Sequence, residues 1–181
     1  MPSNAQQKRR RVRVCHIAMG DLWAGAEVQL AALVCDQICR PEIEVSVVLF
    51  NEGRLASELR ALKAQVTILP EIQWNGPKLI WKLIKYCRKN KFDIVHTHKY
   101  KDNILGTIAA VRCGVPHIVR TVHGLPEPFR GIQALRMRIL ESIDDLLIRM
   151  STSRLIAVSS EIEQLLAATY GPRKVVQIHN G

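Results

Sequence analysis

Two histidines in one short run are the residues of this sequence most suited to chemistry. His96 and His98 close the apolar run at residues 92–98 and are separated by a single residue. Alternate residues of a β-strand point to the same face, so we expect the two imidazoles to lie side by side. Two imidazoles can ligate a metal, but the sequence shows no obvious third ligand nearby. We therefore expect no metal site, and we expect the pair to make structural hydrogen bonds or His98 to line a cleft.

A third histidine ends the next apolar run. His123 and Gly124 close the stretch at 116–124, and an irregular segment at 125–131, which contains Arg130, follows them. Because imidazole titrates near neutral pH, His123 can donate a hydrogen bond to a ligand or assist proton transfer. A structural hydrogen bond explains this histidine equally well, so both interpretations stay open. Gly124 and Arg130 are further candidates for a cleft beside it.

A glycine loop follows the first apolar run. It covers residues 20–27 and places Gly25 and Ala26 where a helix is expected to begin. Backbone N–H groups at a helix N-terminus attract phosphate, and glycine lets a ligand approach the backbone. The spacing is neither the G-x-G-x-x-G fingerprint nor a P-loop, which argues against an NAD-dependent dehydrogenase. A tight strand-to-helix turn is the alternative interpretation.

Apolar runs that alternate with amphipathic stretches must position these residues. We expect strands at 11–19, 44–50, 65–70, 92–98, 116–124, 154–159 and 174–181. Helices are expected at 25–39, 55–63, 77–90, 102–113, 132–150 and 160–170. This alternation predicts the α/β class, as a Rossmann-like three-layer domain with a mostly parallel seven-stranded sheet. The loops after parallel strands then meet at one edge, where ligand sites form.

The composition agrees with one such domain. The chain has 181 residues, of which 48% are apolar, and this excludes a disordered protein. No apolar run is long enough to span a membrane, and no apolar stretch of signal-peptide length lies before residue 12, so we expect no signal peptide. The five cysteines are scattered, so we expect free thiols in a reducing compartment, with a cytoplasmic location as the default.

The charge is strongly basic, at a net +10. Part of it lies in a tail at 1–11 that we expect to be flexible, and part in a basic amphipathic helix at 77–91. We expect Trp74, Trp81 and Tyr86 to lie near the potential interface of this helix. A second basic region surrounds the helix at 132–150. A solvated basic face is one interpretation, and docking on an anionic membrane surface is the other. No nucleic-acid module is present, so we expect no nucleic-acid partner.

Four short motifs resemble, in order and position, the N-terminal half of family 4 glycosyltransferases, which have the two-domain GT-B architecture. The motifs are Gly-Ala-Glu at 25–27, Asp-Ile-Val-His-Thr-His at 93–98, Thr-Val-His-Gly at 121–124, and Ala-Val-Ser-Ser at 157–160 with His-Asn-Gly at 179–181. The resemblance covers about residues 12 to 181. Family members often carry a second glycine where this chain has Ala24, and the acidic donor-domain motif of the family is absent from the sequence.

The resemblance implies a hexosyltransferase-type enzyme that uses a nucleotide sugar, retains the anomeric configuration and needs no cofactor or metal. It implies that residues 12–178 form the acceptor-binding half, that 179–181 begin a hinge with Asn180 in the cleft, and that a donor-binding domain is missing. Gly25 and Ala26 would lie near the donor diphosphate, and His123 would contact the donor sugar near the reacting centre. The acceptor would be a glycan or a lipid-linked sugar, at the inner face of the membrane, and this half alone is expected to be inactive.

Two alternative functions stay open. The first is a non-catalytic acceptor- or membrane-binding module that works with a separate donor subunit. The second is a nucleotide-sugar epimerase of similar architecture, which would convert its sugar without any acceptor. Dependence of turnover on an acceptor separates the transferase from the epimerase.

Overall fold

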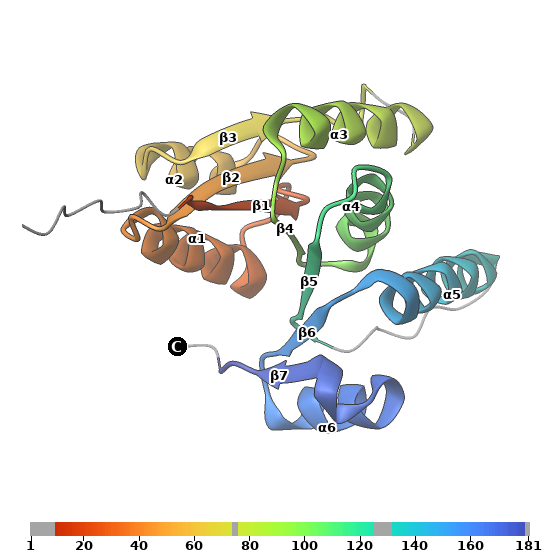
Figure 1. The fold of residues 1–181 in the computed structure, drawn as a ribbon. Coiled ribbons are helices and arrows are strands. Elements are labelled where there is room, and N and C mark those ends of the chain that lie inside the picture. Colours follow the sequence, from red (N-terminus) through yellow and green to blue (C-terminus); the bar gives the residue numbers. More distant parts are fainter. Residues whose placement is uncertain (1–9, 74–75, 125–131, 180–181) are drawn as a thin grey trace, which may run out of the picture.

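A seven-stranded sheet covered by helices forms the body of the chain (Figure 1). The structure, a computed structural model, describes residues 10–73, 76–124 and 132–179. The strands are β1 (Val12–Ala18), β2 (Ile43–Leu49), β3 (Gln65–Ile68), β4 (Ile94–Thr97), β5 (His117–Val122), β6 (Arg154–Ala157) and β7 (Val175–Gln177). The helices are α1 (Gly25–Ile38), α2 (Arg54–Ala61), α3 (Gly76–Asn90), α4 (Tyr100–Arg112), α5 (Ile132–Ser151) and α6 (Ser160–Tyr170), with a 3-10 turn η1 (Pro172–Lys174) before β7.

The strand order places a reversal at the centre of the sheet. The order is β3-β2-β1-β4-β5-β6-β7, and every neighbouring pair is parallel. The expected Rossmann-like α/β fold with seven strands is confirmed. The chain moves outward from β1 in one direction, returns, and continues from β4 in the other, so β1 and β4 flank the topological switch point. A crevice opens at the carboxyl ends of the strands at such a point, and it is the usual ligand site of open α/β sheets.

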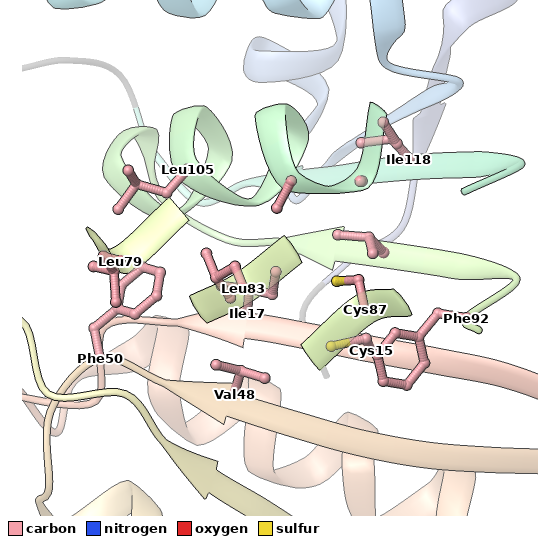
Figure 2. Packing of buried hydrophobic residues seen from close by; sticks show 13 residues of the cluster. Cys15, Ile17, Val48, Phe50, Leu79, Leu83, Cys87, Phe92, Leu105 and Ile118 are labelled. Atoms are coloured by element: carbon pink, nitrogen blue, oxygen red, sulfur yellow. The ribbon is translucent and has the colours of Figure 1, made fainter. Parts of the chain in front are cut away.

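Apolar side chains fill both sides of the first half of the sheet. Between the sheet and helices α3 and α4 lies a cluster that includes Ile17, Phe50, Leu83 and Val95, all fully buried (Figure 2). Helices α1 and α2 cover the opposite face of β1 and β2 with a second cluster around Val34, and a third joins α5 and α6 to β6 and β7. The first two of these cores hold the strand ends at β1 and β4 in place.

Several element ends differ from the expected bounds, and at α4 the difference has a local cause. Helix α4 begins at Tyr100 and not at Asp102, because the Asp102 carboxylate accepts the backbone N–H groups of His98 and Lys99 at 2.7 and 2.9 Å and so caps an earlier start. Strand β5 ends at Val122, so the loop and not the strand carries the next two residues. Strand β7 is only three residues long.

Two expected helix ends are confirmed. The hydroxyl of Ser159 accepts the N–H of Ile162 at 3.3 Å and caps α6. Gly114 follows α4 with a positive φ of 65°, a conformation in which glycine has no steric cost. Local chemistry therefore sets these boundaries.

The basic helix α3 presents a mixed surface. Trp81 is 57% exposed, as expected for a residue at an interface, whereas the ring of Tyr86 packs toward the core against Phe92, with ring centroids 5.6 Å apart. The expectation that Tyr86 lies at an interface is wrong, because its position on α3 turns it toward the sheet. Trp74 lies outside the described residues. Across the described ranges, no helix has both the length and the hydropathy that a membrane span requires.

Candidate functional site

The candidate site is a pocket at the carboxyl edge of the sheet, beside the switch point. It has a volume of about 390 Å³ and lies between α1 and strands β4 to β6. Polar groups on its wall come from Gln29, His96, His98, Thr121 and His123. The other lining side chains are mostly apolar, among them Val28, Leu33, Ile156 and Val158. An apolar pocket with a few converging polar groups is the usual form of a small-molecule site.

A chain of three histidines crosses the inner wall of the pocket. His16 Nδ1 lies 3.3 Å from His98 Nε2, and His98 Nδ1 lies 3.4 Å from His123 Nε2. The side chain of Gln37 meets His16 Nε2 at 2.8 Å, and that of Gln29 meets His123 Nδ1 at 3.0 Å. Both glutamines belong to α1, so this helix contacts both ends of the histidine chain. Strand β1, the loop after β4 and the loop after β5 supply the imidazoles.

His96 lies beside this chain. Its ring stacks on that of His98, with centroids 4.4 Å apart, and its Nε2 contacts the hydroxyl of Thr121 at 2.8 Å. The expectation that His96 and His98 share a face is therefore confirmed. The hydrogen-bond partners on β5 and α1 keep the buried ring nitrogens satisfied, as burial of polar groups requires.

Burial keeps these imidazoles neutral. It lowers the pKa of His16 to about 4, against the opposing effect of its hydrogen bond to Gln37. Burial, followed by the repulsion of neighbouring histidines, also lowers the pKa of His96 and of His98. Burial also lowers the pKa of His123, although the Glu27 carboxylate nearby favours its charged form. Neutral imidazoles can each donate one hydrogen bond and accept another.

The sequence shows no obvious third ligand for the pair, but the structure brings a third imidazole beside it. His16, His96 and His98 are all buried, and one nitrogen from each lies within 4.8 Å of the others. In the register of the sheet His16 of β1 pairs directly with His96 of β4. Hydrogen bonds account for these nitrogens in this structure, because Nδ1 of His16 and Nε2 of His98 lie 3.3 Å apart and Nε2 of His96 contacts the hydroxyl of Thr121. That the site works without a metal remains a prediction.

The first turn of α1 borders the site with unused backbone donors. The carbonyl of Ala24 accepts the N–H groups of Glu27 and Val28, at 3.0 Å each. Within the described part of the chain, the N–H groups of Gly25 and Ala26 meet no acceptor. A Cβ added at Gly25 would meet no atom within 4 Å, so the protein's own packing does not require this glycine. Open space and free donors suit an anion, and diphosphate binding here remains a prediction.

A buried ion pair joins the two loops of the switch point. Glu27 of α1 is 3% exposed, and its carboxylate pairs with the Lys99 ammonium just before α4. The other oxygen of Glu27 accepts the N–H of Ala24 at 3.3 Å. Lys99 thus neutralises a carboxylate that would otherwise repel an anion at the start of α1.

The structure brings some predicted site residues together and leaves others apart. Gly25, Ala26, His98 and His123 lie at the same edge of the sheet, and Gly124 is exposed beside them. Arg130 and Asn180 lie outside the described residues. Sequence reasoning missed His16 and both glutamines of α1. The alternation of Cys15, His16 and Ile17 gives the face of this histidine, but nothing local indicates which strand lies beside it.

Comparison with known proteins places the chain in a family. Residues 23–181 match the family described as Glycosyltransferase Family 4. The chain is 26% identical over 178 residues to the UDP-Gal:alpha-D-GlcNAc-diphosphoundecaprenol alpha-1,3-galactosyltransferase of Escherichia coli, covering 94% of this chain and 45% of that protein. It therefore spans less than half the length of this relative.

Solved structures show the same fold. The HepE protein of Anabaena in complex with UDP-glucose superposes with a TM-score of 0.74 at 18% identity, covering 94% of this chain and 44% of that one. A UDP-N-acetylglucosamine 2-epimerase superposes with a TM-score of 0.67 at 14% identity, over 92% and 47% of the two chains. The match over most of its residues and the shared fold show that the chain belongs to glycosyltransferase family 4 and has the fold of the N-terminal domain of a GT-B protein.

Proposed function

We propose that this chain is the acceptor-side half of a retaining hexosyltransferase that moves a sugar from a nucleotide sugar to a glycan or lipid-linked acceptor. The observation that carries the proposal is the pocket beside the switch point, which is lined by His123 and by Val28 and Gln29 of α1, with the free N–H groups of Gly25 and Ala26 just before these two residues in the same helix. HepE was solved with UDP-glucose, and the E. coli relative acts on a diphosphoundecaprenol-linked sugar. These relatives support a UDP-sugar donor and a lipid-linked acceptor.

The chemistry of the site suits such a transfer. The leaving nucleoside diphosphate gains negative charge in the transition state, and preorganised N–H groups at the start of α1 stabilise that charge without rearrangement. The Glu27–Lys99 pair keeps the surroundings of those donors close to neutral. A neutral His123 donates or accepts a hydrogen bond at the sugar without bringing a charge of its own. A second domain would close over the donor and exclude water.

Turnover of a UDP-hexose by the complete protein that contains this chain tests the proposal. We expect release of UDP from UDP-galactose or UDP-glucose that depends on a membrane extract as acceptor. His123→Ala should reduce the rate about 100-fold, a loss of about 2.7 kcal/mol of transition-state stabilisation. His117→Ala is the matched control, because His117 is exposed at the opposite end of β5, and its rate should stay within about twofold of wild type.

The other outcomes are equally informative. Equal rates for the two variants would remove His123 from the site. Turnover of UDP-N-acetylglucosamine without any acceptor would favour the epimerase as the alternative function, since a UDP-N-acetylglucosamine 2-epimerase has the same fold. The proposal includes transfer without a bound metal, so EDTA should leave the rate unchanged. We also propose that residues 1–181 alone have little activity, which the same assay measures directly.

The exposed surfaces of α3 and α5 suggest which side of the protein faces a membrane that holds a lipid-linked acceptor. Helices α3, α4 and α5 lie next to one another on one face of the sheet (Figure 1). Along α5 an exposed apolar stripe carries Leu135, Ile139, Ile143, Leu146 and Met150. We propose that this stripe and the basic side of α3 rest on an anionic membrane on the cytoplasmic side, with the +10 net charge assisting.

Vesicle co-sedimentation tests this docking. The chain should bind vesicles that contain anionic phospholipid, bind neutral vesicles much more weakly, and be released by high salt. The double variant Ile139→Glu with Leu146→Glu should lose binding at least tenfold. Leu165→Glu, on the exposed side of α6, is the control and should bind like wild type. Equal binding to neutral and anionic vesicles would contradict the charge-based part of the proposal.

A further inference from the structure

The histidine chain has more hydrogen-bond contacts than its neutral imidazoles have protons. Four contacts link Gln37, His16, His98, His123 and Gln29 in that order, at 2.8, 3.3, 3.4 and 3.0 Å. A hydrogen bond between two such groups needs one proton between them. Three neutral imidazoles bring only three protons for the four contacts. The structure places Oε1 of both glutamines against the imidazoles, so the fourth proton requires one of the two side chains to turn its NH₂ group toward the ring, while the other glutamine accepts through its oxygen.

Only two neutral arrangements satisfy every contact. In the first, Gln37 accepts, each imidazole carries its proton on Nε2, and Gln29 donates to His123 Nδ1. In the second, Gln29 accepts, each imidazole carries its proton on Nδ1, and Gln37 donates to His16 Nε2. Mixed arrangements place two protons, or none, in one contact and so leave a buried polar group unpaired, which is unfavourable. His16 and His98 are at most 5% exposed, so water offers them little relief.

We propose that His16 and His98 are positioning residues that couple the tautomer of His123 to Gln37, so that the three imidazoles change tautomer together. Gln29 lines the pocket and covers Nδ1 of His123, so a bound molecule that takes the place of Gln29 meets this nitrogen. A ligand oxygen that accepts a hydrogen bond selects the Nδ1–H arrangement of the whole chain, with Gln37 donating at the far end. The role of His123 toward a donor sugar rests on the proposed function, whereas the coupling itself does not.

The surroundings of the chain leave these two arrangements as the main alternatives. The groups that face it are the ring of His96, which stacks on His98, and the Glu27–Lys99 pair near His123. His96 is held separately by Thr121 and makes no ring-nitrogen hydrogen bond to the chain within the described residues. Both glutamines lie on α1, about two turns apart, so one rigid element sets the distance between the two ends.

Two matched variants on α1 test the coupling. A carboxylate can only accept, so Gln37→Glu should force the Nε2–H tautomer and Gln29→Glu the Nδ1–H tautomer. The measurement is long-range ¹H–¹⁵N correlation NMR of the ¹⁵N-labelled 181-residue chain at pH 7.5, which distinguishes the two tautomers of each histidine. We expect opposite tautomers at His98 in the two variants, although neither substitution touches this residue. His117, which is exposed and does not belong to the histidine chain, is the internal reference.

The outcomes separate cleanly. The same tautomer at His98 in both variants, or a change confined to the histidine next to the new carboxylate, would overturn the proposal. About one equivalent of zinc in the purified chain would also overturn it, because the metal would occupy the nitrogens that the coupling uses. If the variants do not fold, the wild type still decides: His16, His98 and His123 must show one common tautomer or one common average. A tautomer change on adding UDP-glucose tests the ligand step, and its absence would count against the proposed function alone.

Discussion

Strands β1 and β4 present two different environments on their two faces. Toward α3 and α4, Cys15, Ile17 and Val95 are fully buried among apolar side chains (Figure 2). Toward α1, the alternate residues His16, His96 and His98 are buried almost as deeply, and hydrogen bonds as well as ring stacking hold them. One face is held by apolar packing, and the other adds these hydrogen bonds to the apolar packing of α1.

The difference shows how the site is built into the fold. The apolar face resists any change of volume, because its energy is spread over many contacts. The histidine face depends on partners from α1 and β5, and a lost partner leaves a buried nitrogen unsatisfied. Four perturbations test this division, in order of decreasing expected effect.

The largest effect should come from a cavity in the apolar face. Leu83 of α3 is fully buried in that cluster, and Leu83→Ala should lower the free energy of unfolding by about 2 to 5 kcal/mol. Leu22→Ala is the control, since Leu22 is 59% exposed, and it should cost less than about 0.5 kcal/mol. Urea unfolding of the 181-residue chain measures both. A cost below about 1 kcal/mol at Leu83 would mean that the apolar face does not dominate stability.

Low pH should destabilise the protein through the face of the sheet that carries the histidines. His16 has a folded pKa of about 4, below the ordinary 6.5, so the unfolded chain binds this proton first as the pH falls. The contribution of neutral His16 to the free energy of unfolding is fully present above pH 6.5. It is lost as the pH falls toward 4, which lowers that free energy by about 3 kcal/mol. Asp102 works in the other direction, because burial raises its pKa to about 6 and the folded state then binds its proton more tightly.

Unfolding measured across this pH range checks the sign. The variant His16→Gln should show a flatter pH dependence than wild type, whereas His117→Gln, at an exposed position, should not differ from it. Parallel curves for wild type and His16→Gln would mean that the imidazole of His16 is not held neutral by burial.

A smaller loss is expected when one hydrogen bond of the histidine face is removed. Thr121→Val leaves Nε2 of buried His96 without its 2.8 Å partner and should cost about 1 to 3 kcal/mol. Thr152→Val is the matched control: Thr152 is 4% exposed, and its hydroxyl has no partner in the ranges that the structure describes. That substitution should be neutral or slightly stabilising. Equal costs at the two positions would argue that shape, and not hydrogen bonding, holds this face.

The smallest effect on stability is expected at the start of α1. Gly25→Ala adds a methyl group to open space at a helical position, so the chain should unfold within about 1 kcal/mol of wild type. Gly106→Ala is the contrast, because a Cβ there would approach Thr97 Cγ2 to 2.9 Å. If the proposed diphosphate site exists, Gly25→Ala should nevertheless weaken UDP binding at least tenfold in calorimetry. Unchanged UDP binding would remove this loop from the site.

Much of the architecture follows from local pattern. The alternation of apolar and amphipathic runs predicted all seven strands and six helices, because strand and helix periods are properties of short segments. The helix ends at Gly114 and Ser159 follow from a single residue each. The same local patterns placed His98 and His123 at strand ends and Gly25 at the helix start after the first strand, and parallel strands bring such positions to one edge.

The sequence by itself therefore determined the fold class, the element order and the edge at which the candidate site lies. Only the tertiary structure decided that His16 lies beside His98, and that Gln37 and Gln29 close the chain. The reason is physical: a residue's face depends on its immediate neighbours, whereas its partner on another strand depends on sheet order and register. Those are set by the packing of crossover helices against the whole sheet, which no single segment contains.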